Sequence, residues 1–164
     1  MTIITASIND AATIATIIRE ANEDVARQFG LNADNCPKHP SLCQTDWVLT
    51  DFNRGEEYFL YQQDGVDIGC VAFEQPKPEV AYLNRLSVLP QYRHHGIGRS
   101  LVQFVFGYAR QKNITRVSIG IIAENVRLRN WYLNLGFREG ERKIFPHLPF
   151  DVLYMSASIS AAAL

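Results

Sequence analysis

One segment constrains the fold more than any other: residues 89–100, which read LPQYRHHGIGRS. It follows the apolar run 82–88 and precedes a long amphipathic stretch, so a strand, a turn, a glycine loop and a helix succeed one another without a gap. Glycines let backbone N–H groups approach a phosphate closely, and the N-terminus of the following helix adds a favourable dipole. The segment therefore predicts a loop that binds a pyrophosphate.

Two better-known glycine loops do not fit this segment. A Walker loop ends in Gly-Lys-Ser/Thr, and the chain contains no Gly-Lys pair. A dinucleotide fingerprint needs a third glycine where this chain has Leu101, and an acidic residue about twenty positions on, where residues 115–119 have none.

The pattern that fits is Arg-x-x-Gly-x-Gly at residues 93–98, with Gln91 two positions upstream. It resembles the acetyl-CoA loop of the GNAT superfamily of N-acetyltransferases. Residues 83–90 (LNRLSVLP) resemble that family's fourth strand, and Asn125 is followed seven residues later by Tyr132 and then by Gly136-Phe137, as in the family. The resemblance is strong over residues 82–137 and weak over the first seventy.

The resemblance implies an α/β fold with a central mixed β-sheet flanked by helices on both faces, and acetyl-CoA as co-substrate. In the family, the fourth strand pairs its freed main chain with the pantetheine arm, and the loop amides bind the pyrophosphate. The expected cofactor-binding residues are Leu86, Val88, Arg93, His94, His95, Gly96, Ile97, Gly98, Arg99, Ser100 and Asn125. Arg99 and Ser100 also suit a solvated first turn of a helix, and Asn125 also suits a helix cap.

Tyr132 is the expected general acid, because a phenol near the sulfur can protonate the departing thiolate. Trp131 precedes it on the same helix, and the spacing from Asn125 selects Tyr132. The alternative is that Tyr132 is a packed aromatic of the core.

The general base is harder to assign. A primary amine with a pKa near 10.4 is almost wholly protonated at neutral pH, and reversing this costs about 4–5 kcal/mol. Some relatives carry a glutamate on the fourth strand near the position of Asn84, whose amide cannot accept the proton. The candidates are Glu79, His147, or a water chain held by Asn84, and His147 is the one expected at the active site.

Composition sets the broad class. The chain has 164 residues, 47% of them apolar, which suits a single domain over residues 1–164 with one core. The net charge of −1 gives no field that favours nucleic acid. No apolar run reaches the ~20 residues needed to span a bilayer, and residues 1–4 lack the features of a signal peptide. We therefore expect a cytoplasmic protein with no membrane or nucleic-acid partner, and a homodimer is possible.

The segment 36–43 looks metal-like because it holds Cys36, His39 and Cys43. Structural zinc needs four ligands, usually in paired short spacings, and no second pair is present. We expect no metal, and the odd count of three cysteines suits reduced thiols. The resemblance places this segment beside the acceptor, where Lys38 and His39 would contact substrate.

Hydrophobic periodicity and turn residues predict eleven elements in the order β-α-α-β-β-β-α-β-α-β-β. The expected strands are 2–8, 58–62, 68–74, 80–88, 117–122, 137–145 and 152–159. The expected helices begin at Asn9 or Asp10 and run to Phe29, then cover 44–52, 97–112 and 124–135, and the tail 160–164 is expected to fray.

The leading functional interpretation is acetyl transfer from acetyl-CoA to the primary amine of a small molecule by direct attack. One alternative is an acyl-CoA-binding regulator without turnover, for which Asn84 is the only support. Another is acetylation of a protein N-terminus or lysine, against which the aromatic segment 145–150 suggests a closed pocket.

Overall fold

The structure, a computed structural model, describes residues 1–160; of the predicted tail, residues 161–164 lie outside the described part. The strands are β1 (Thr2–Thr5), β2 (Glu57–Gln63), β3 (Val66–Lys77), β4 (Val80–Val88), β5 (Arg116–Ile122), β6 (Arg138–Lys143) and β7 (Val152–Ser158). The α-helices are α1 (Ala11–Ala21), α2 (Glu23–Phe29), α3 (Thr45–Asn53), α4 (Ile97–Gln111) and α5 (Val126–Asn134).

The strands form one seven-stranded sheet in the order β1-β2-β3-β4-β5-β7-β6. The β4–β5 pair is parallel, whereas β1–β2, β2–β3, β5–β7 and β6–β7 are antiparallel. The predicted fold, a mixed sheet flanked by helices, is confirmed.

The chain divides into two compact units. Unit 1 comprises residues 1–74 and 84–103, and unit 2 comprises residues 75–83 and 104–164. Three elements, β3, β4 and α4, run through both units.

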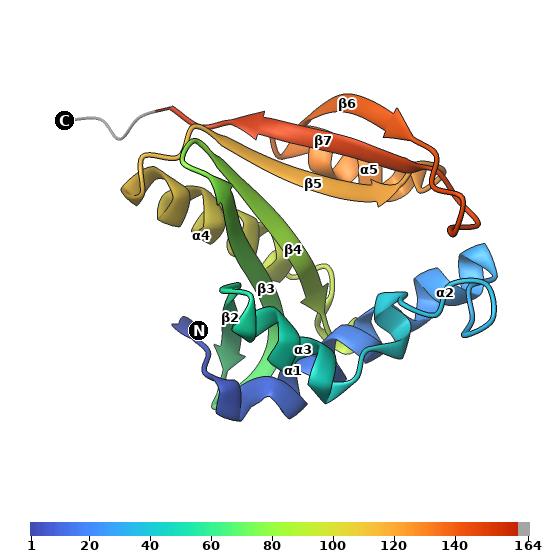
Figure 1. Ribbon diagram of the computed structural model, residues 1–164. Helices are drawn as coiled ribbons and strands as arrows, with labels where there is room; N and C mark the ends of the chain where they lie inside the picture. The colour runs from blue at the N-terminus through green and yellow to red at the C-terminus, as the bar shows by residue number, and fades with distance from the viewer. Residues whose placement is uncertain (161–164) are drawn as a thin grey trace. The chain divides into compact units, whose positions relative to one another are not determined.

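The core of unit 1 lies where α1 and α3 pack against β2 and β3. Ile14 and Ile18 of α1, Val48 of α3 and Leu60 of β2 are all completely buried in one cluster. Figure 1 shows α1 and α3 side by side, in contact with each other. The i, i+4 spacing of Ile14 and Ile18 gives α1 the apolar face that this packing needs.

The prediction of one helix running to Phe29 was wrong, because the helix breaks at Asn22. The Asn22 side chain donates to the Ile18 carbonyl at 2.7 Å, and its backbone (φ −108°, ψ 2°) leaves the helical region. The N–H of Val25 bonds to the Asp24 carboxylate at 3.0 Å. The side chains of Asn22 and Asp24 thus compete with the regular backbone ladder, and α2 starts as a separate helix.

The first strand is also shorter than predicted. The Ser7 hydroxyl accepts a hydrogen bond from the Asn9 N–H at 3.3 Å, and the Asp10 carboxylate accepts one from the Ser7 N–H at 2.8 Å. This capping box begins a short 3₁₀ helix that leads into α1, so Ser7 supplies the cap expected from Asn9 or Asp10.

Unit 2 contains β5, β7 and β6, with α5 in contact with β6. Gly136, at φ +99°, follows the end of α5. The next residue, Phe137, is buried against Phe106 and Tyr132, with ring centroids 5.6 and 5.2 Å away. All of β6 is exposed, and the strand is shorter than predicted at both ends.

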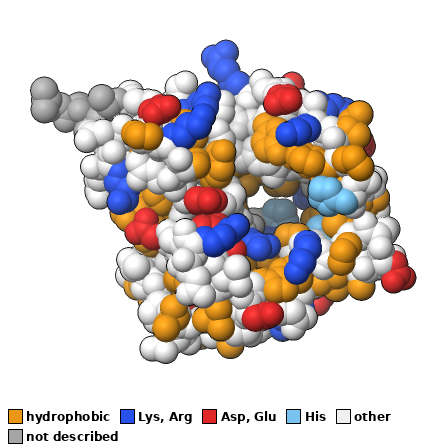
Figure 2. Space-filling model, viewed as in Figure 1, with side chains coloured by type: hydrophobic (Ala, Val, Ile, Leu, Met, Phe, Trp, Pro, Cys, Tyr) orange, Lys and Arg blue, Asp and Glu red, His pale blue; other side chains and the backbone are white. Residues whose placement is uncertain are grey.

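On the face visible in Figure 2, acidic and basic side chains are intermixed. Among the described residues, no helix combines the length and the apolar character that crossing a bilayer requires.

Candidate functional site

The glycine loop presents a row of unpaired donors at the start of α4. The backbone N–H groups of residues 94–99 have no hydrogen-bond acceptor within residues 1–160, and only the Ser100 N–H turns back, to the Gly96 carbonyl at 3.0 Å. His94 and Gly96 adopt positive φ angles of 66° and 80°. Orphan donors at the N-terminus of a fifteen-residue helix suit an anion, which is what the sequence predicted for this segment.

The side chain of Arg93 is engaged elsewhere in unit 1. Its guanidinium donates to the Asp24 carboxylate at 2.6 Å and to the Ala21 carbonyl at 2.5 Å. Ala21 is the last residue of α1, and its carbonyl is available because the Val25 N–H bonds to Asp24 instead. Arg93 therefore anchors the glycine loop to the junction of α1 and α2, a role that sequence reasoning missed.

The contact with Arg93 changes the pKa of the Asp24 carboxyl. Burial alone would raise its pKa, but the hydrogen bond and the positive charge of Arg93 outweigh burial and lower it.

The remaining loop residues differ in their exposure to solvent. His94, His95, Gly96, Arg99 and Ser100 are exposed, whereas Ile97 is buried and holds the start of α4 to the core. On β4, Leu86 and Val88 are half-buried. They lie beyond the register of β4 with β5, which covers Val80–Tyr82.

In unit 2, Asn125 and Tyr132 occupy the two ends of α5. The Asn125 side chain accepts a hydrogen bond from the Leu128 N–H at 3.2 Å, so it caps the helix. Tyr132 is 5% exposed and its ring meets Trp131 and Phe137 edge-on. Burial raises the pKa of the Tyr132 hydroxyl, which donates no hydrogen bond to any of the described residues.

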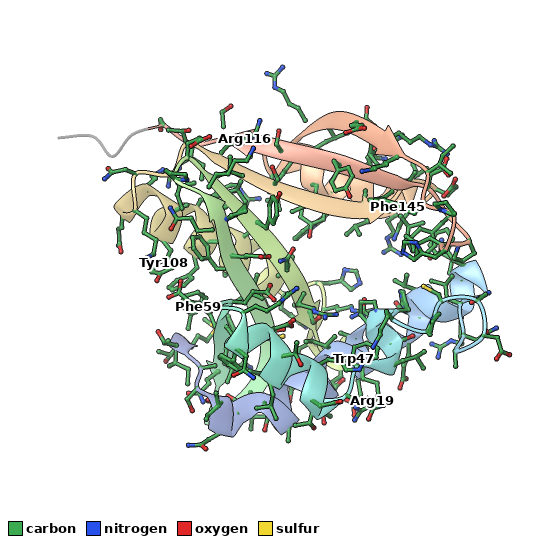
Figure 3. All side chains as sticks on the ribbon, viewed as in Figure 1. Arg19, Trp47, Phe59, Tyr108, Arg116 and Phe145 are labelled. Atoms are coloured by element: carbon green, nitrogen blue, oxygen red, sulfur yellow. The ribbon has the colours of Figure 1, made fainter. Side chains whose placement is uncertain are left out.

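The two side chains considered for the base in unit 2 are exposed. Within residues 1–160, the one aromatic contact of the His147 ring is with Phe145, and the two ring centroids lie 5.7 Å apart. Figure 3 labels Phe145, which precedes this histidine after the end of β6. Glu79 lies in the turn between β3 and β4, where its carbonyl accepts the N–H groups of Thr115 and Arg116.

A pocket in unit 1 was not foreseen as a whole. Its volume is about 300 Å³, and it is lined by Pro40, Asp51, Arg54, Glu56, Asn84 and Arg85. Asn84 was singled out in the sequence, but its neighbours from α3 and from the turn after α3 were not. The pocket is large enough for a small ligand and is lined mainly by polar groups.

Glu56 lies at the centre of the hydrogen bonding in this pocket. It is 4% exposed, and its Oε2 accepts from Arg54 at 2.6 Å. Its Oε1 accepts from the Asn84 amide at 2.9 Å, and the same amide donates to Glu74 at 3.2 Å. Asn84 itself carries no carboxylate, but its amide holds the Glu56 carboxylate in place from β4.

Asp51 supports the same pocket from α3. Its carboxylate is almost completely buried and accepts from the Tyr58 hydroxyl at 2.5 Å and from Arg54 at 3.2 Å. Arg85 completes the cluster of charged groups, because its Nε lies 3.5 Å from Asp51 Oδ2.

The backbone of Arg85 explains why two consecutive residues of β4 line one pocket. Neighbouring side chains of a regular strand point to opposite faces. Arg85 instead has a φ of +58°, rare for a residue with a side chain, and this breaks the alternation. Asn84 and Arg85 therefore both line the pocket.

A signal for Glu56 was present in the sequence. Asp51 and Glu56 flank the turn Arg54-Gly55, and Glu56 stands almost directly before the apolar run 58–61. A carboxylate beside a buried strand needs a partner, and Arg54 is two residues away.

The cysteine and histidine segment is packed inward. Cys36, Cys43 and His39 are buried, and the His39 Nδ1 lies 2.8 Å from the Ser41 hydroxyl. Lys38 lies over the ring of Trp47, 4.9 Å from its centroid. Arg19, labelled with Trp47 in Figure 3, donates to the Cys43 carbonyl at 2.8 Å. Within residues 1–160, no three His, Cys, Asp or Glu side chains are grouped to hold a metal ion.

Comparison with known proteins gives consistent matches. The sequence profile of the acetyltransferase (GNAT) family matches residues 18–137. An uncharacterized N-acetyltransferase of Methanocaldococcus jannaschii is 30% identical over 101 residues, which is 58% of this chain and 44% of that protein. The ribosomal protein bS18-alanine N-acetyltransferase of Escherichia coli is 28% identical over 98 residues, 57% of this chain and 66% of that protein. The chain thus spans less than two thirds of these relatives' lengths.

Solved structures share the fold over almost the whole chain. The crystal structure of the ribosomal-protein-S18-alanine N-acetyltransferase from Escherichia coli has a TM-score of 0.77 at 19% identity, covering 99% of this chain and 96% of that one. The Salmonella typhimurium protein yncA, solved with its cofactor acetyl-CoA, has a TM-score of 0.70 at 19% identity, with the same coverage.

Proposed function

Because this chain belongs to the acetyltransferase (GNAT) family, we propose that it transfers an acetyl group from acetyl-CoA to the primary amine of a small molecule. The observation that carries the proposal is the row of unpaired N–H groups at residues 94–99, next to the start of α4. Acetyl-CoA supplies an activated acyl thioester together with the diphosphate that such a row of donors suits.

The residues of this chain divide the work of holding that group. The amides of residues 94–99 bind the diphosphate, and the exposed side chains of Arg99 and Ser100 are close enough in sequence to add charge and a hydroxyl. The main chain at Leu86 and Val88 pairs with the amides of the pantetheine arm. Asn125 acts by capping α5, and the loop is held in position by the contact of Arg93 with Asp24.

Tyr132 is the proposed general acid, which gives its hydroxyl proton to the sulfur that leaves. Two properties support this role: the hydroxyl has no partner among the described residues, and its raised pKa keeps it protonated. His147 and Glu79 have no such support beyond their place in the sequence. Both side chains are exposed.

The proposal is tested by incubating the protein with acetyl-CoA and a panel of amines while following the release of free thiol. We expect thiol release that depends on both the amine and the protein. Calorimetry with desulfo-coenzyme A, which cannot react, should show binding. Binding without thiol release for any amine would favour the acyl-CoA-binding regulator, and absence of binding would contradict the whole proposal.

A second candidate function is acetylation of a protein N-terminus. The similarity to the bS18-alanine N-acetyltransferase of Escherichia coli favours it, because that enzyme is named for an alanine of a ribosomal protein as its acceptor. Mass spectrometry of peptides that begin with alanine, compared with free amines at equal concentration, separates the two functions. Faster modification of the peptides would replace the small-molecule acceptor with a protein.

A further inference from the structure

We propose that Glu56 removes the proton from the acceptor's ammonium group, and that the pocket lined by Asp51, Arg54, Glu56, Asn84 and Arg85 holds that ammonium. This inference deepens the acetyltransferase function proposed above and rests on it. Its ligand class is a primary ammonium ion, and its main observation is a buried carboxylate at the wall of a cavity of about 300 Å³.

The carboxylate of Glu56 is held in place and still has capacity to bind. Arg54 donates to Oε2 at 2.6 Å and Asn84 donates to Oε1 at 2.9 Å. A carboxylate has about four acceptor positions, and the carboxyl of Asp51 also shares a hydrogen bond with Glu56, so one position remains for a ligand. Two donors from different segments therefore fix the orientation of Glu56 without exhausting it.

The charge of the cluster favours a cationic ligand. Two carboxylates, of Asp51 and Glu56, and two guanidiniums, of Arg54 and Arg85, line the pocket. Glu74, which accepts the other hydrogen bond of the Asn84 amide, adds a third carboxylate to the cluster. The cluster is therefore short of one positive charge, which a bound ammonium would supply. An anionic ligand would increase the imbalance, and charges buried without partners are costly.

Asn84 is a positioning residue in this arrangement. Both hydrogen bonds of its amide nitrogen go to carboxylates, at Glu56 and Glu74, and its Oδ1 has no partner within residues 1–160. That oxygen can accept one ammonium hydrogen while Glu56 accepts another. The Asn84 amide on β4 cannot accept a proton, but it does not need to, because Glu56 in the turn before β2 supplies the carboxylate.

The surroundings tune Glu56 toward this role. Burial raises the pKa of its carboxyl, and the negative charge of Asp51 on α3 and the hydrogen bond between the two carboxyls add to this. The hydrogen bonds from Asn84 on β4 and from Arg54 act in the opposite direction. The other groups that face the cluster are Arg85 on β4, Glu74 on β3 and the Tyr58 hydroxyl on β2. A carboxylate with a raised pKa is a better base near neutral pH than an ordinary one.

The chemical step balances without further reactants. The ammonium gives one proton to the Glu56 carboxylate, which leaves a neutral amine and a carboxylic acid. The amine nitrogen bonds to the thioester carbonyl carbon and the carbon–sulfur bond breaks. As the amide forms, the nitrogen loses its second proton to water and the thiolate takes up the hydroxyl proton of Tyr132. Tyr132 then regains a proton from water, and Glu56 returns its own proton to water.

The kinetic test compares Glu56→Gln with the parent on two acceptors that differ in basicity. An N-α-blocked lysine has an amine with a pKa near 10.4, whereas alaninamide is an α-amine with a pKa near 7.7–8.0. At pH 7 we expect kcat/KM of the variant to fall about 100-fold or more for the lysine derivative. The loss should be clearly smaller for alaninamide, a larger share of which is already neutral.

The pH profile separates this role from a structural one. In the parent, kcat/KM should rise through the pKa of Glu56 and level off below the pKa of the amine. In Glu56→Gln it should keep rising until the pKa of the amine is reached. Equal losses for the two acceptors, with the parent's pH profile unchanged, would overturn the proposal. Glu141→Gln is the matched control, because Glu141 is an exposed carboxylate on β6 and its loss should leave both readouts unchanged.

Binding tests the pocket without turnover. In the parent, millimolar ethylammonium should shift the NMR signals of the Asn84 side-chain amide, and acetate should not. In Glu56→Gln the affinity for ethylammonium obtained from this titration should fall by about tenfold or more. The thermal unfolding curve of the variant is the control that it folds. A response to acetate in place of ethylammonium would overturn the proposal. Parent protein that shows the ethylammonium shift but no thiol release would contradict the acetyltransferase function and leave the ammonium pocket standing.

Discussion

Burial sets the chemistry of Tyr132. Its ring lies among Trp131 and Phe137, and removal from water raises the pKa of its hydroxyl, so the group stays protonated throughout the neutral range. The raised pKa makes the hydroxyl a weaker acid than an exposed phenol. It also ensures that the proton is present on Tyr132 when the thiolate leaves.

We predict that Tyr132→Phe lowers turnover about 100-fold while leaving the affinity for acetyl-CoA within about threefold, because only the hydroxyl is removed. Steady-state kinetics and calorimetry measure the two quantities. The ring is kept, so the thermal unfolding temperature is the control. Turnover equal to that of the parent across the pH range would show that the hydroxyl is not the acid.

A second residue-scale prediction concerns Arg93. Arg93→Ala removes an ion pair and a hydrogen bond to the end of α1, and should lower the free energy of unfolding by about 1–2 kcal/mol at pH 7. The pKa of Asp24 is lowered in the folded state, so this stabilisation is present above the unfolded value of about 3.9 and is lost as pH falls through the folded value.

Urea unfolding of the parent and the variant at several pH values tests this. The difference between them should be full at pH 6–7 and should narrow below about pH 4. A difference that stays constant down to the acid limit would mean that Asp24 is not the partner that matters.

The residues that sequence reasoning found and missed differ in a physical way. The glycine loop could be predicted from the sequence because its pattern is local, and each of its residues would act through its own backbone. Glu56 was missed because Asn84, the partner that joins it to β4, lies 28 residues away and no spacing rule links the two, although its other donor, Arg54, is only two residues away. The positive φ of Arg85 was equally invisible, since a non-glycine residue carries no mark of that conformation.

Among the elements, the loop before α4 depends on a conformation that favours glycine. Gly96 has a φ of +80°, and an added Cβ would meet nothing within 4 Å. A substitution there is strained by the backbone rather than by crowding, at a cost of about 1–3 kcal/mol. Relief of that strain would rotate the amides of residues 94–99 away from their present directions.

We therefore predict that Gly96→Ala weakens coenzyme A binding by about tenfold or more in calorimetry. Gly107→Ala is the matched control, because Gly107 lies within α4, has no positive φ and has open space around its Cβ position. That variant should gain about 0.5–1 kcal/mol of helix stability. Equal coenzyme A affinities in the two variants would argue against binding by the loop amides.

The boundaries of the elements show where periodicity stops being informative. The apolar spacing of residues 14–29 is continuous and predicted one helix, but the side-chain hydrogen bonds of Asn22 and Asp24 break it. Asn is a poor helix residue for this reason, yet its propensity alone does not say which asparagine ends a helix. Long periodic segments such as α4 and β4 were placed to within a residue or two.

For the molecule as a whole, the chain passes between its two units inside β3, β4 and α4. Neither unit is a continuous piece of sequence, so the boundary does not run along a linker. The prediction of a single domain over residues 1–164 follows from the same absence of a linker in the sequence.

We expect one cooperative thermal transition, with circular dichroism and tryptophan fluorescence superimposing. Trp47 belongs to unit 1 and Trp131 to unit 2, so a variant lacking either tryptophan reports on one unit alone. Two transitions that separate between Trp47→Phe and Trp131→Phe would show that the units unfold independently.

The burial of the three cysteines determines how much the protein's own thiols contribute to the assay for free coenzyme A. Cys36, Cys43 and Cys70 are all shielded, and burial raises the pKa of each, to about 12 for Cys70. Since only the thiolate reacts, the native protein should be nearly silent toward a chromogenic disulfide reagent. The absorbance change would then measure the thiol of coenzyme A alone. A slow additional phase, from the protein's own cysteines, would measure the fraction of unfolded molecules.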